Sequence, residues 1–406
     1  MRQDFCLLSD DCPSLRFNGK FADLVALNTG NALALRPVLD EEARTRLDRL
    51  PGHGTDTALV VGGNGFVGAH MVARLSRDPR VRTVLATVRA SNGRDPRERL
   101  EDTLRKYQLT NLKAEKIEVL DATPVKHRFG LPAARYRDLA EEVDLVFGCA
   151  SSTDYATPYL GMRDDWVEGL LRQVQFTTEG KRKHLTYIGA LGSHFYRDPD
   201  DFRRPDSWWY SGYAQMKWVN ATVLRWLARD HLLPVTLCDA PTVLGATDFG
   251  VDPGKIYSWW RGVEIARSLG LFWKGAGMCY VPVDILADAL AVNALADRPL
   301  SYLLPRNPVP YDNELIADLL DLRLVDWPEF VAEASRQVSS IRVAPLVSAD
   351  AVALVQIINE PPAVMPPGYD ESWCDNRRLY ELYLSNIRFR DVRIGSYRRL
   401  SDVRDR

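Results

Sequence analysis

Two side chains one helical turn apart, Tyr213 and Lys217, have the residue types and the spacing for proton transfer. The pattern Tyr-x-x-x-Lys places both side chains on the same face of a helix. A free tyrosine has a pKa of about 10, and a neighbouring ammonium group lowers that pKa because it favours the phenolate. Such a phenol can give or accept a proton at a carbonyl oxygen. We therefore interpret Tyr213 and Lys217 as a catalytic pair.

A glycine-rich turn earlier in the chain has the pattern of a nucleotide cradle. An apolar run of strand character precedes the turn, and an amphipathic helical pattern follows it. In such a turn one glycine permits the bend, one lets the backbone approach a diphosphate, and one lets the helix pack closely on the strand. The N–H groups at the start of the helix then face the phosphates. The residues expected to bind a dinucleotide here are Gly62, Gly65, Phe66, Val67 and Gly68.

The next expected strand, residues 81–88, ends at Arg89. Dinucleotide folds contact the adenosine ribose at this point. An acidic residue favours the free 2′-hydroxyl, whereas an arginine suits a 2′-phosphate. Arg89 therefore predicts NADP(H), in practice NADPH for a reduction. Arg99, on the helix that follows, is expected to close on the same phosphate.

Two further strand ends complete the predicted cofactor site. Residues 117–120 form a strand that leads to Asp121 and Ala122, which we expect at the adenine amino group. Residues 143–149 form another, and Ala150 and Ser151 follow at its carboxyl end, where open α/β sheets bind their ligands. Tyr213 and Lys217 are expected at the nicotinamide ribose as well as at the substrate.

Strands and helices alternate along the first two thirds of the chain. This alternation predicts an α/β fold, a Rossmann-type doubly wound parallel sheet. After about residue 246 the pattern becomes mostly helical, which indicates a smaller C-terminal substrate-binding region around a cleft. We divide the chain into an N-terminal extension of unknown role (1–55), an NADP-binding domain (56–245, with 279–297 returning to it) and a substrate-binding part (246–278 and 298–406).

The bulk composition is that of an ordinary globular protein. The 406 residues carry a formal net charge of −2, so nucleic acid is not expected as a partner. The 6 cysteines are scattered without metal-ligand spacing, which predicts a reducing compartment and no metal site. Neither a signal peptide nor a membrane-spanning run is evident. We therefore expect a cytoplasmic protein that does not associate with a membrane, and the oligomeric state is left open.

From residue 57 to about residue 390 the chain resembles the thioester reductase domains of the extended short-chain dehydrogenase/reductases. These domains terminate non-ribosomal peptide and polyketide assembly lines and carboxylic acid reductases. Residues 61–68, Val-Gly-Gly-Asn-Gly-Phe-Val-Gly, match the family's Thr-Gly-Ala-Thr-Gly-Phe-Val-Gly. Residues 211–219 resemble Ser-Gly-Tyr-x-x-Ser-Lys-Trp-Val, and residues 280–284 resemble Phe-Val-Pro-Val-Asp. Residues 87–90 match the segment that binds the NADP phosphate.

The resemblance implies hydride transfer from NADPH to an acyl thioester, usually one tethered to a carrier protein through phosphopantetheine. It implies that an aldehyde is released, and that some members reduce the aldehyde again to an alcohol. Residues 1–55 are too few for a carrier domain, so we expect an acyl or peptidyl carrier protein to supply the thioester in trans, within natural-product biosynthesis.

Several positions depart from the family's pattern. The family places Ser or Thr at the end of the fifth strand, where this chain has Gly189 and Ala190. Losing one such hydrogen-bond donor to the oxyanion costs roughly 100- to 1000-fold in rate. Ser193 lies just beyond and is our candidate catalytic substitute. The usual His or Asn at the fourth strand end is Gly148, and the expected Asn of the next helix corresponds to Trp166.

These departures keep other functions open. A fatty acyl-CoA reductase, or another extended reductase acting on a free carbonyl, would share the same motifs. A ring-closing relative without redox chemistry would not need Tyr213. An NADP(H)-binding sensor or scaffold without catalysis would explain the missing hydroxyl groups, but not the retention of both Tyr213 and Lys217.

Two other groups of side chains suggest contacts with a partner or a substrate. The basic run 181–184 offers charge for an acidic carrier protein, although a solvated loop explains it more simply. Trp208, Trp209, Trp259, Trp260 and Trp273 offer aromatic surface for a substrate channel, although packing in the core or in an interface is the commoner role of such residues.

Overall fold

The computed structural model describes most of the chain. The described residues are 5–6, 16–17, 22–38, 41–51, 54–154, 157–191, 212–230, 233–250, 258–275, 279–308, 312–337, 363–369 and 373–386. Among the positions singled out above, Ser193, Trp208 and Trp209 lie outside these residues.

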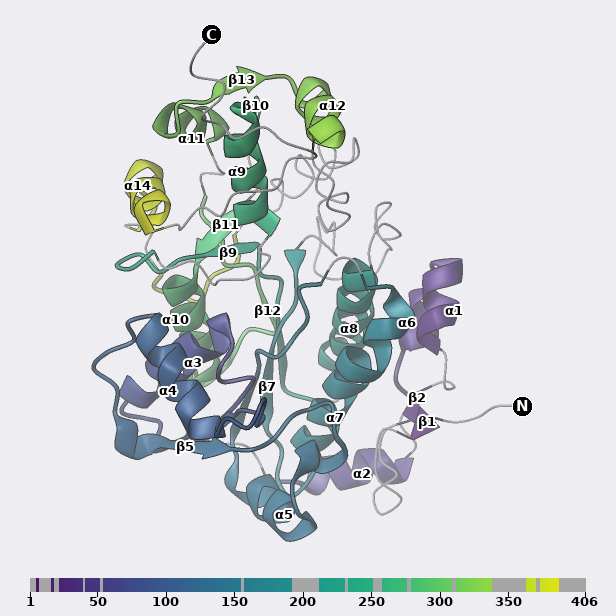
Figure 1. The fold of residues 1–406 in the computed structure, drawn as a ribbon. Coiled ribbons are helices and arrows are strands. Elements are labelled where there is room, and N and C mark those ends of the chain that lie inside the picture. The colour runs from purple at the N-terminus through teal and green to yellow at the C-terminus, as the bar shows by residue number, and fades with distance from the viewer. Residues whose placement is uncertain are drawn as a thin grey trace.

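A seven-stranded sheet with the order β12-β8-β7-β6-β3-β4-β5 forms the centre of the molecule (Figure 1). Each neighbouring pair in it is parallel. The predicted doubly wound parallel sheet is therefore confirmed. Its strands are β3 (Thr57–Val61), β4 (Thr83–Thr87), β5 (Ile117–Leu120), β6 (Leu145–Gly148), β7 (His184–Ile188), β8 (Val235–Cys238) and β12 (Tyr302–Leu303).

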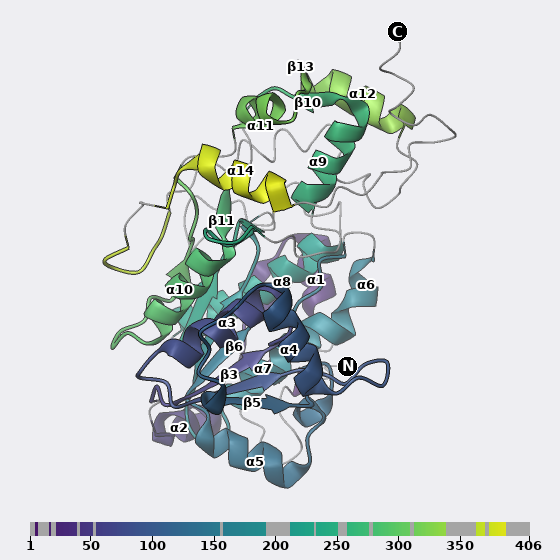
Figure 2. The same ribbon diagram turned by 60° about the vertical axis from the view of Figure 1, so that its left-hand side comes forward.

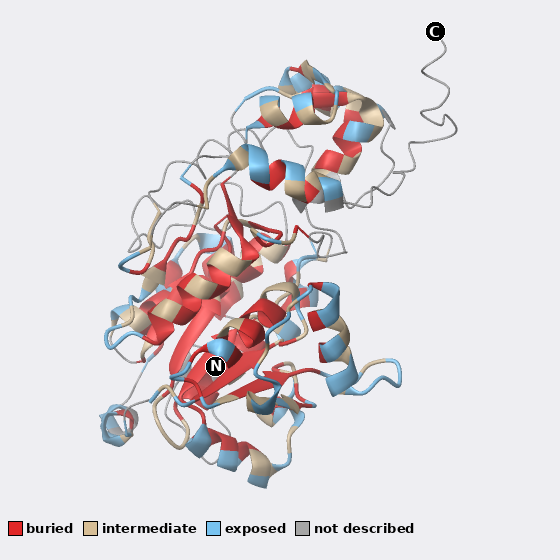
Figure 3. Ribbon diagram, turned by 90° about the vertical axis from the view of Figure 1, so that its left-hand side faces the viewer, coloured by how far each residue is buried: buried red, intermediate tan, exposed pale blue. Residues whose placement is uncertain are grey.

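Helices cover both faces of the sheet, as parallel strands require. In the central strands successive side chains join opposite apolar clusters: Ala58 and Val60 lie in one, and Leu59 and Val61 lie in the other. The resulting red layer of strands between helices is plain in Figure 3. One face packs on α3 (Phe66–Arg77), α4 (Pro96–Lys106) and α10 (Val283–Ala294), and the other packs on α5 (Ala133–Glu142), α7 (Glu168–Thr177) and α8 (Gly212–Arg229).

The expected strands 81–88, 117–120 and 143–149 recur with small shifts at their ends, as β4, β5 and β6. β12, with 2 residues, is too short to leave a periodic pattern, and it was not predicted. The helical segment before β7 is divided into α6 (Tyr159–Met162), a π-helical stretch (Arg163–Val167) and α7. Residues 349–358, part of the C-terminal segment expected to be mostly helical, lie outside the described residues.

The N-terminal segment packs against the outside of α8. It contains α1 (Ala22–Thr29), the 3₁₀ turn Ala32–Leu35 and α2 (Glu41–Arg49), besides the short antiparallel pair β1 (Phe5–Cys6) and β2 (Arg16–Phe17). Ala26 and Leu27 are buried in the same apolar cluster as α8. The Trp226 indole N–H donates to the Ala32 carbonyl oxygen at 3.1 Å. This segment therefore covers a helix rather than an edge of the sheet.

The C-terminal part lies above the sheet in Figure 2, and it has an apolar cluster of its own. Its described residues form two parallel two-stranded sheets and four helices. In the described part of the chain, every helix is too short or too polar to pass through a lipid bilayer. The elements are β9 (Thr242–Leu244), α9 (Ser258–Leu269), β10 (Leu271–Trp273), β11 (Tyr280–Pro282), α11 (Asn313–Leu319), β13 (Arg323–Val325), α12 (Trp327–Gln337) and α14 (Asn376–Asn386).

Candidate active site

The glycine turn between β3 and α3 has the geometry of a diphosphate cradle. Gly62 has φ +85°, a left-handed conformation that favours glycine. Its N–H donates to the Thr87 hydroxyl at 2.9 Å, which ties the turn to the end of β4. A Cβ at Gly68 would overlap the Gly62 carbonyl oxygen, so only glycine lets α3 approach this closely. Gly65 caps α3 without a side-chain hydrogen bond, which leaves the N–H groups that begin at Phe66 directed out of the helix.

The end of β4 gathers positive charge next to this cradle. Arg89 is exposed, and the Arg99 guanidinium donates to the Arg89 carbonyl oxygen. Burial lowers the pKa of Arg99, and the charges of Arg89 and Arg94 lower it further. Several guanidinium groups crowded in this way are stabilised by an anion between them. The arrangement fits the 2′-phosphate of NADP(H).

The other predicted cofactor residues lie along the carboxyl edge of the sheet. The Asp121 carboxylate accepts the Ala90 N–H at 2.8 Å, so Asp121 orders the backbone that follows Arg89. Ala150 and Ser151 follow β6 and are partly buried. A Cβ at Gly62 would lie 3.0 Å from the Ala150 Cα, so this strand end borders the glycine turn.

Tyr213 and Lys217 project from the first turns of α8 toward the end of β7. Lys217 is 3% exposed, and its ammonium group donates to the Ile188 carbonyl oxygen at 2.9 Å. That nitrogen lies 5.9 Å from the centre of the Tyr213 ring and 5.2 Å from that of Tyr187. The fold thus brings the two predicted catalytic residues together beside the cofactor edge.

The proton affinity of Lys217 is set by its surroundings. Burial lowers the pKa of Lys217 to about 7, and the negative charge of Asp239 acts in the opposite direction. A lysine with a pKa in this range changes charge near neutral pH. Its ammonium form is the one that favours the Tyr213 phenolate.

At Gly148, one of the strand ends where the family carries polar groups, neighbouring side chains leave little space for a substituent. A Cβ at Gly148 would lie 2.8 Å from the Gln173 amide oxygen and 2.9 Å from the Tyr187 ring. Gly189 donates its N–H to the Cys238 carbonyl oxygen at 2.7 Å. Because Ser193 lies outside the described residues, its predicted role stays a prediction.

Asn220 is a polar residue of the site that the motifs did not reveal. It lies on α8, three residues after Lys217, and is fully buried. Its amide N–H₂ donates to the Tyr187 hydroxyl at 2.9 Å and to the Trp166 carbonyl oxygen at 3.2 Å. The position expected to be Asn in the helix, Trp166, therefore contributes its backbone instead. The spacing from Lys217 was the available signal, since residues i and i+3 share a helix face.

Neither interpretation of the basic run 181–184 was right. Lys183 and His184 are buried, and the Lys181 ammonium pairs with the Asp144 carboxylate at 2.5 Å. Burial lowers the pKa of Lys183 to about 7. The positive charges therefore point into the protein and offer no docking surface for an acidic partner.

Among the tryptophans expected near a substrate, Trp273 has a packing role. Its ring stacks on Phe272 with centroids 4.4 Å apart, and it contacts Trp327 and Phe330 in the C-terminal cluster. The side chains of Trp259 and Trp260 lie outside the described set.

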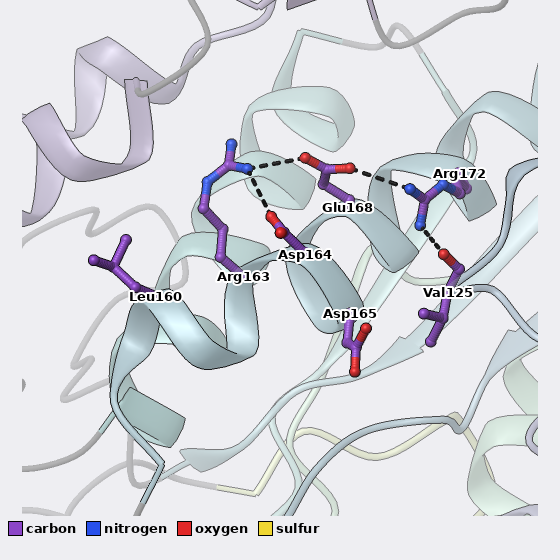
Figure 4. Close-up of a pocket in the computed structure, with 7 residues that line it drawn as sticks. All are labelled: Val125, Leu160, Arg163, Asp164, Asp165, Glu168 and Arg172. Atoms are coloured by element: carbon purple, nitrogen blue, oxygen red, sulfur yellow. Dashed lines mark hydrogen bonds and ion pairs between the residues drawn. The ribbon is translucent and has the colours of Figure 1, made fainter.

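A cavity of about 560 Å³ opens beside the π-helical stretch, and neither Tyr213 nor Lys217 lines it (Figure 4). The guanidinium groups of Arg163 and Arg172 both contact Glu168, and Arg172 also donates to the Val125 carbonyl oxygen. The two arginines of the cavity are thus paired with groups of the protein. The lining residues are Val125, Leu160, Arg163, Asp164, Asp165, Glu168 and Arg172.

Comparison with protein families supplies the classification. The family model described as Male sterility protein, an NAD-binding model, matches residues 60–290. The chain belongs to this family. The matched segment of the male sterility domain includes the glycine turn, Arg89, Tyr213 and Lys217, which agrees with a nicotinamide cofactor.

Three similar proteins indicate which members of the family the chain resembles. Trichosetin synthetase PKS-NRPS1 of Gibberella fujikuroi is 27% identical over 245 residues, which are 60% of this chain and 6% of that protein. The terminal R domain of the myxalamid PKS-NRPS pathway superposes with a TM-score of 0.68 at 21% identity, covering 86% of this chain and 95% of that one. The reductase domain of a non-ribosomal peptide synthetase from Mycobacterium tuberculosis gives 0.63 at 21% identity, with the same coverage.

The chain thus spans a small fraction of its curated relative and nearly all of the two solved domains. The resemblance to the thioester reductase domains is confirmed. The fold is that of these two reductase domains.

Proposed function

We propose that this chain reduces an acyl thioester to an aldehyde with NADPH as the reductant. The observation that carries the proposal is the position of Lys217. Its ammonium is anchored on the Ile188 carbonyl oxygen beside the Tyr213 ring, at the sheet edge that holds the glycine turn. A proton donor and a dinucleotide cradle therefore face the same space.

The chain's own residues would act on the carbonyl oxygen of the substrate. The bound cofactor supplies hydride to the carbonyl carbon. As negative charge grows on the carbonyl oxygen, the Tyr213 hydroxyl donates a hydrogen bond or a proton to it. The resulting thiohemiacetal then breaks its C–S bond, so that the thiol leaves with the hydroxyl proton and the aldehyde is released. The Lys217 ammonium stabilises the resulting phenolate, and its own anchor keeps it in place.

NADPH is proposed over NADH because of the arginines beyond β4. The Arg99 guanidinium donates to the Arg89 carbonyl oxygen and the charge of Arg89 acts on it, so a 2′-phosphate there would relieve the repulsion. The proposed adenine contacts are Asp121 and Ala122.

The proposed substrate is an acyl group on the phosphopantetheine of a carrier protein. The names of the similar proteins support this choice, since they belong to peptide and polyketide synthetases. A CoA thioester carries the same pantetheine arm and is the alternative. Comparing turnover of one acyl group on a carrier protein and on CoA distinguishes the two.

The test is NADPH oxidation in the presence of an acyl thioester, with Tyr213→Phe as the diagnostic variant. This change removes a single hydroxyl group, and we expect kcat to fall by about 100- to 10,000-fold because proton donation is lost. Tyr136→Phe is the matched control. The Tyr136 ring packs between Phe129 and Phe176, so this change should leave kcat unchanged. An equally fast Tyr213→Phe enzyme would show that the mechanism is wrong.

A sensor that binds NADP(H) without catalysis is the second candidate, favoured by the absence of a hydroxyl at Gly189 and Ala190. It predicts that wild type binds NADPH, measured by quenching of tryptophan fluorescence, yet oxidises none of it with any carrier-bound or CoA thioester.

A further inference from the structure

Asp239 lies beside Gly189, one of the two positions where the hydroxyl group was expected. It follows β8 as Gly189 follows β7, and these strands pair in register at Ile188 and Cys238. The Gly189 N–H donates to the Cys238 carbonyl oxygen at 2.7 Å, which extends the pairing to the next residues. Gly189 and Asp239 are therefore neighbours across the two strands.

The Asp239 carboxylate crowds the space of a side chain at position 189. A Cβ added to Gly189 would lie 2.7 Å from the Asp239 Oδ1, closer than carbon and oxygen atoms approach without displacement. Gly189 is not among the glycines with positive φ, so its conformation does not require glycine. The neighbouring Asp239 carboxylate is what favours glycine at this position.

Asp239 and Lys217 are both buried, and each charge acts on the other. Asp239 is 0% exposed and Lys217 is 3% exposed, so each charge needs a partner inside the protein. Arg225, further along α8, contacts Asp239 at 3.4 Å. The titratable groups that act on Asp239 are Arg225, Tyr302 and Lys217, and those around Lys217 are Asp239, Cys149, Cys238, Tyr187 and Tyr213.

We propose that Asp239 is a positioning residue for the catalytic pair, whose carboxylate takes the space of a side chain at 189 and supplies the negative charge that keeps Lys217 protonated. This inference rests on the proposed function of the same site. Among the groups that act on Lys217, Asp239 is the acid with the largest effect, and it raises the pKa of Lys217 against the effect of burial. Burial raises the pKa of Asp239 to about 6 and lowers that of Lys217 to about 7, so both charges are present between these values.

The first test is the pH dependence of kcat in Asp239→Asn, which keeps the shape of the side chain and removes its charge. Without that charge the pKa of Lys217 falls, so the decline of kcat with rising pH should begin about one pH unit lower than in wild type. The KM for NADPH should stay unchanged. Asp144→Asn is the matched control, because Asp144 is also buried but pairs with Lys181 at the other end of β6. A purely structural role would lower kcat in Asp239→Asn without moving the pH profile, and would overturn the proposal.

The second test is a double-mutant cycle at positions 189 and 239. Gly189→Ser alone should lower kcat on the order of 100-fold, because the overlap with Asp239 displaces the site. In the background of Asp239→Ala the same change should have little effect, since the space is open. Equal effects of Gly189→Ser in both backgrounds would contradict the steric part of the proposal.

The titration of Lys217 can be followed without substrate, by NMR of the lysine side chains in wild type and Asp239→Asn. A lower pKa in the variant supports the proposal even if wild type reduces no thioester, which would refute only the proposed function. An unchanged pKa of Lys217 overturns the inference even if the enzyme is active.

Discussion

At the scale of single residues, two positive side chains of the proposed site differ in their exposure to solvent. Lys217 is buried and anchored on a backbone oxygen, whereas Arg89 is exposed at a strand end. Burial makes the charge of Lys217 respond to pH near neutrality, and exposure leaves Arg89 available for a ligand. We therefore propose that the two residues act on different ends of one cofactor.

Replacing Arg89 should separate the two nicotinamide cofactors. We expect Arg89→Ala to raise the Kd for NADPH by about 10- to 100-fold, the loss of one charge-assisted hydrogen bond, and to leave the Kd for NADH nearly unchanged. Titration calorimetry with both cofactors measures this. Arg97→Ala is the control, since it removes an arginine from an exposed position of the neighbouring helix α4. Equal weakening of both cofactors would show that Arg89 does not contact the 2′-phosphate.

At the scale of elements, ion pairs fix the end of α3 that lies away from the cofactor. Asp78, at the C-terminal end of α3, pairs with Arg74 at 3.0 Å and with Arg80 at 2.9 Å. Arg74 in turn pairs with Asp288 of α10, so two helices from distant parts of the sequence are joined on one face of the sheet. The glycine turn at the opposite end of α3 depends on this alignment.

The acid stability of the protein should report on Asp78. The hydrogen bonds from Arg80, followed by those from Arg74, hold the pKa of Asp78 well below its usual range. A depressed folded pKa stabilises the protein fully above the unfolded pKa of about 4, and this stability is lost progressively as pH falls from there through the folded pKa. Asp78→Asn should therefore lower the free energy of unfolding most at pH 7, and by a smaller amount at pH 3. Urea denaturation at both values checks this, and a pH-independent difference would contradict it.

At the scale of the whole molecule, the N-terminal segment is joined to the site through buried contacts. Asp23 of α1 accepts hydrogen bonds from the Tyr159 hydroxyl and from the Arg163 guanidinium, the latter at 2.7 Å. Arg163 begins the π-helical stretch that also contains Trp166, whose carbonyl oxygen binds Asn220 beside the catalytic pair. We therefore propose that the segment before residue 55 supports the active site from outside.

Removing Asp23 should destabilise the fold and disturb catalysis together. Breaking one partner of a buried ion pair costs about 3–5 kcal/mol, so we expect Asp23→Ala to lower the free energy of unfolding by that order and to lower kcat. Hydrogen exchange across 163–167 should accelerate. Asp230→Ala is the control, because its partner Arg36 is 51% exposed and the pair contributes little. An unchanged kcat in Asp23→Ala would show that the N-terminal segment does not support the active site.

Local patterns were sufficient for most of the architecture. Strand and helix periodicity predicted the parallel sheet, and the glycine turn and the Tyr-x-x-x-Lys spacing predicted which ends of it are used. These features succeed because they depend on neighbours within one turn or one strand. β12 was missed because 2 residues have no period. The interpretation of residues 181–184 was wrong because charge alone does not show which way a side chain points.

The sequence by itself determined the order of the elements, the glycine cradle, and the presence of Tyr213 and Lys217 on one helix face. The tertiary structure alone decided what surrounds them. That Asp239 takes the space beside Gly189, and that Asn220 meets the backbone of Trp166, depends on strands and helices distant along the chain. The physical reason is that burial and the distance between charges set the proton affinity of a lysine, and both are properties of the packed molecule rather than of any segment.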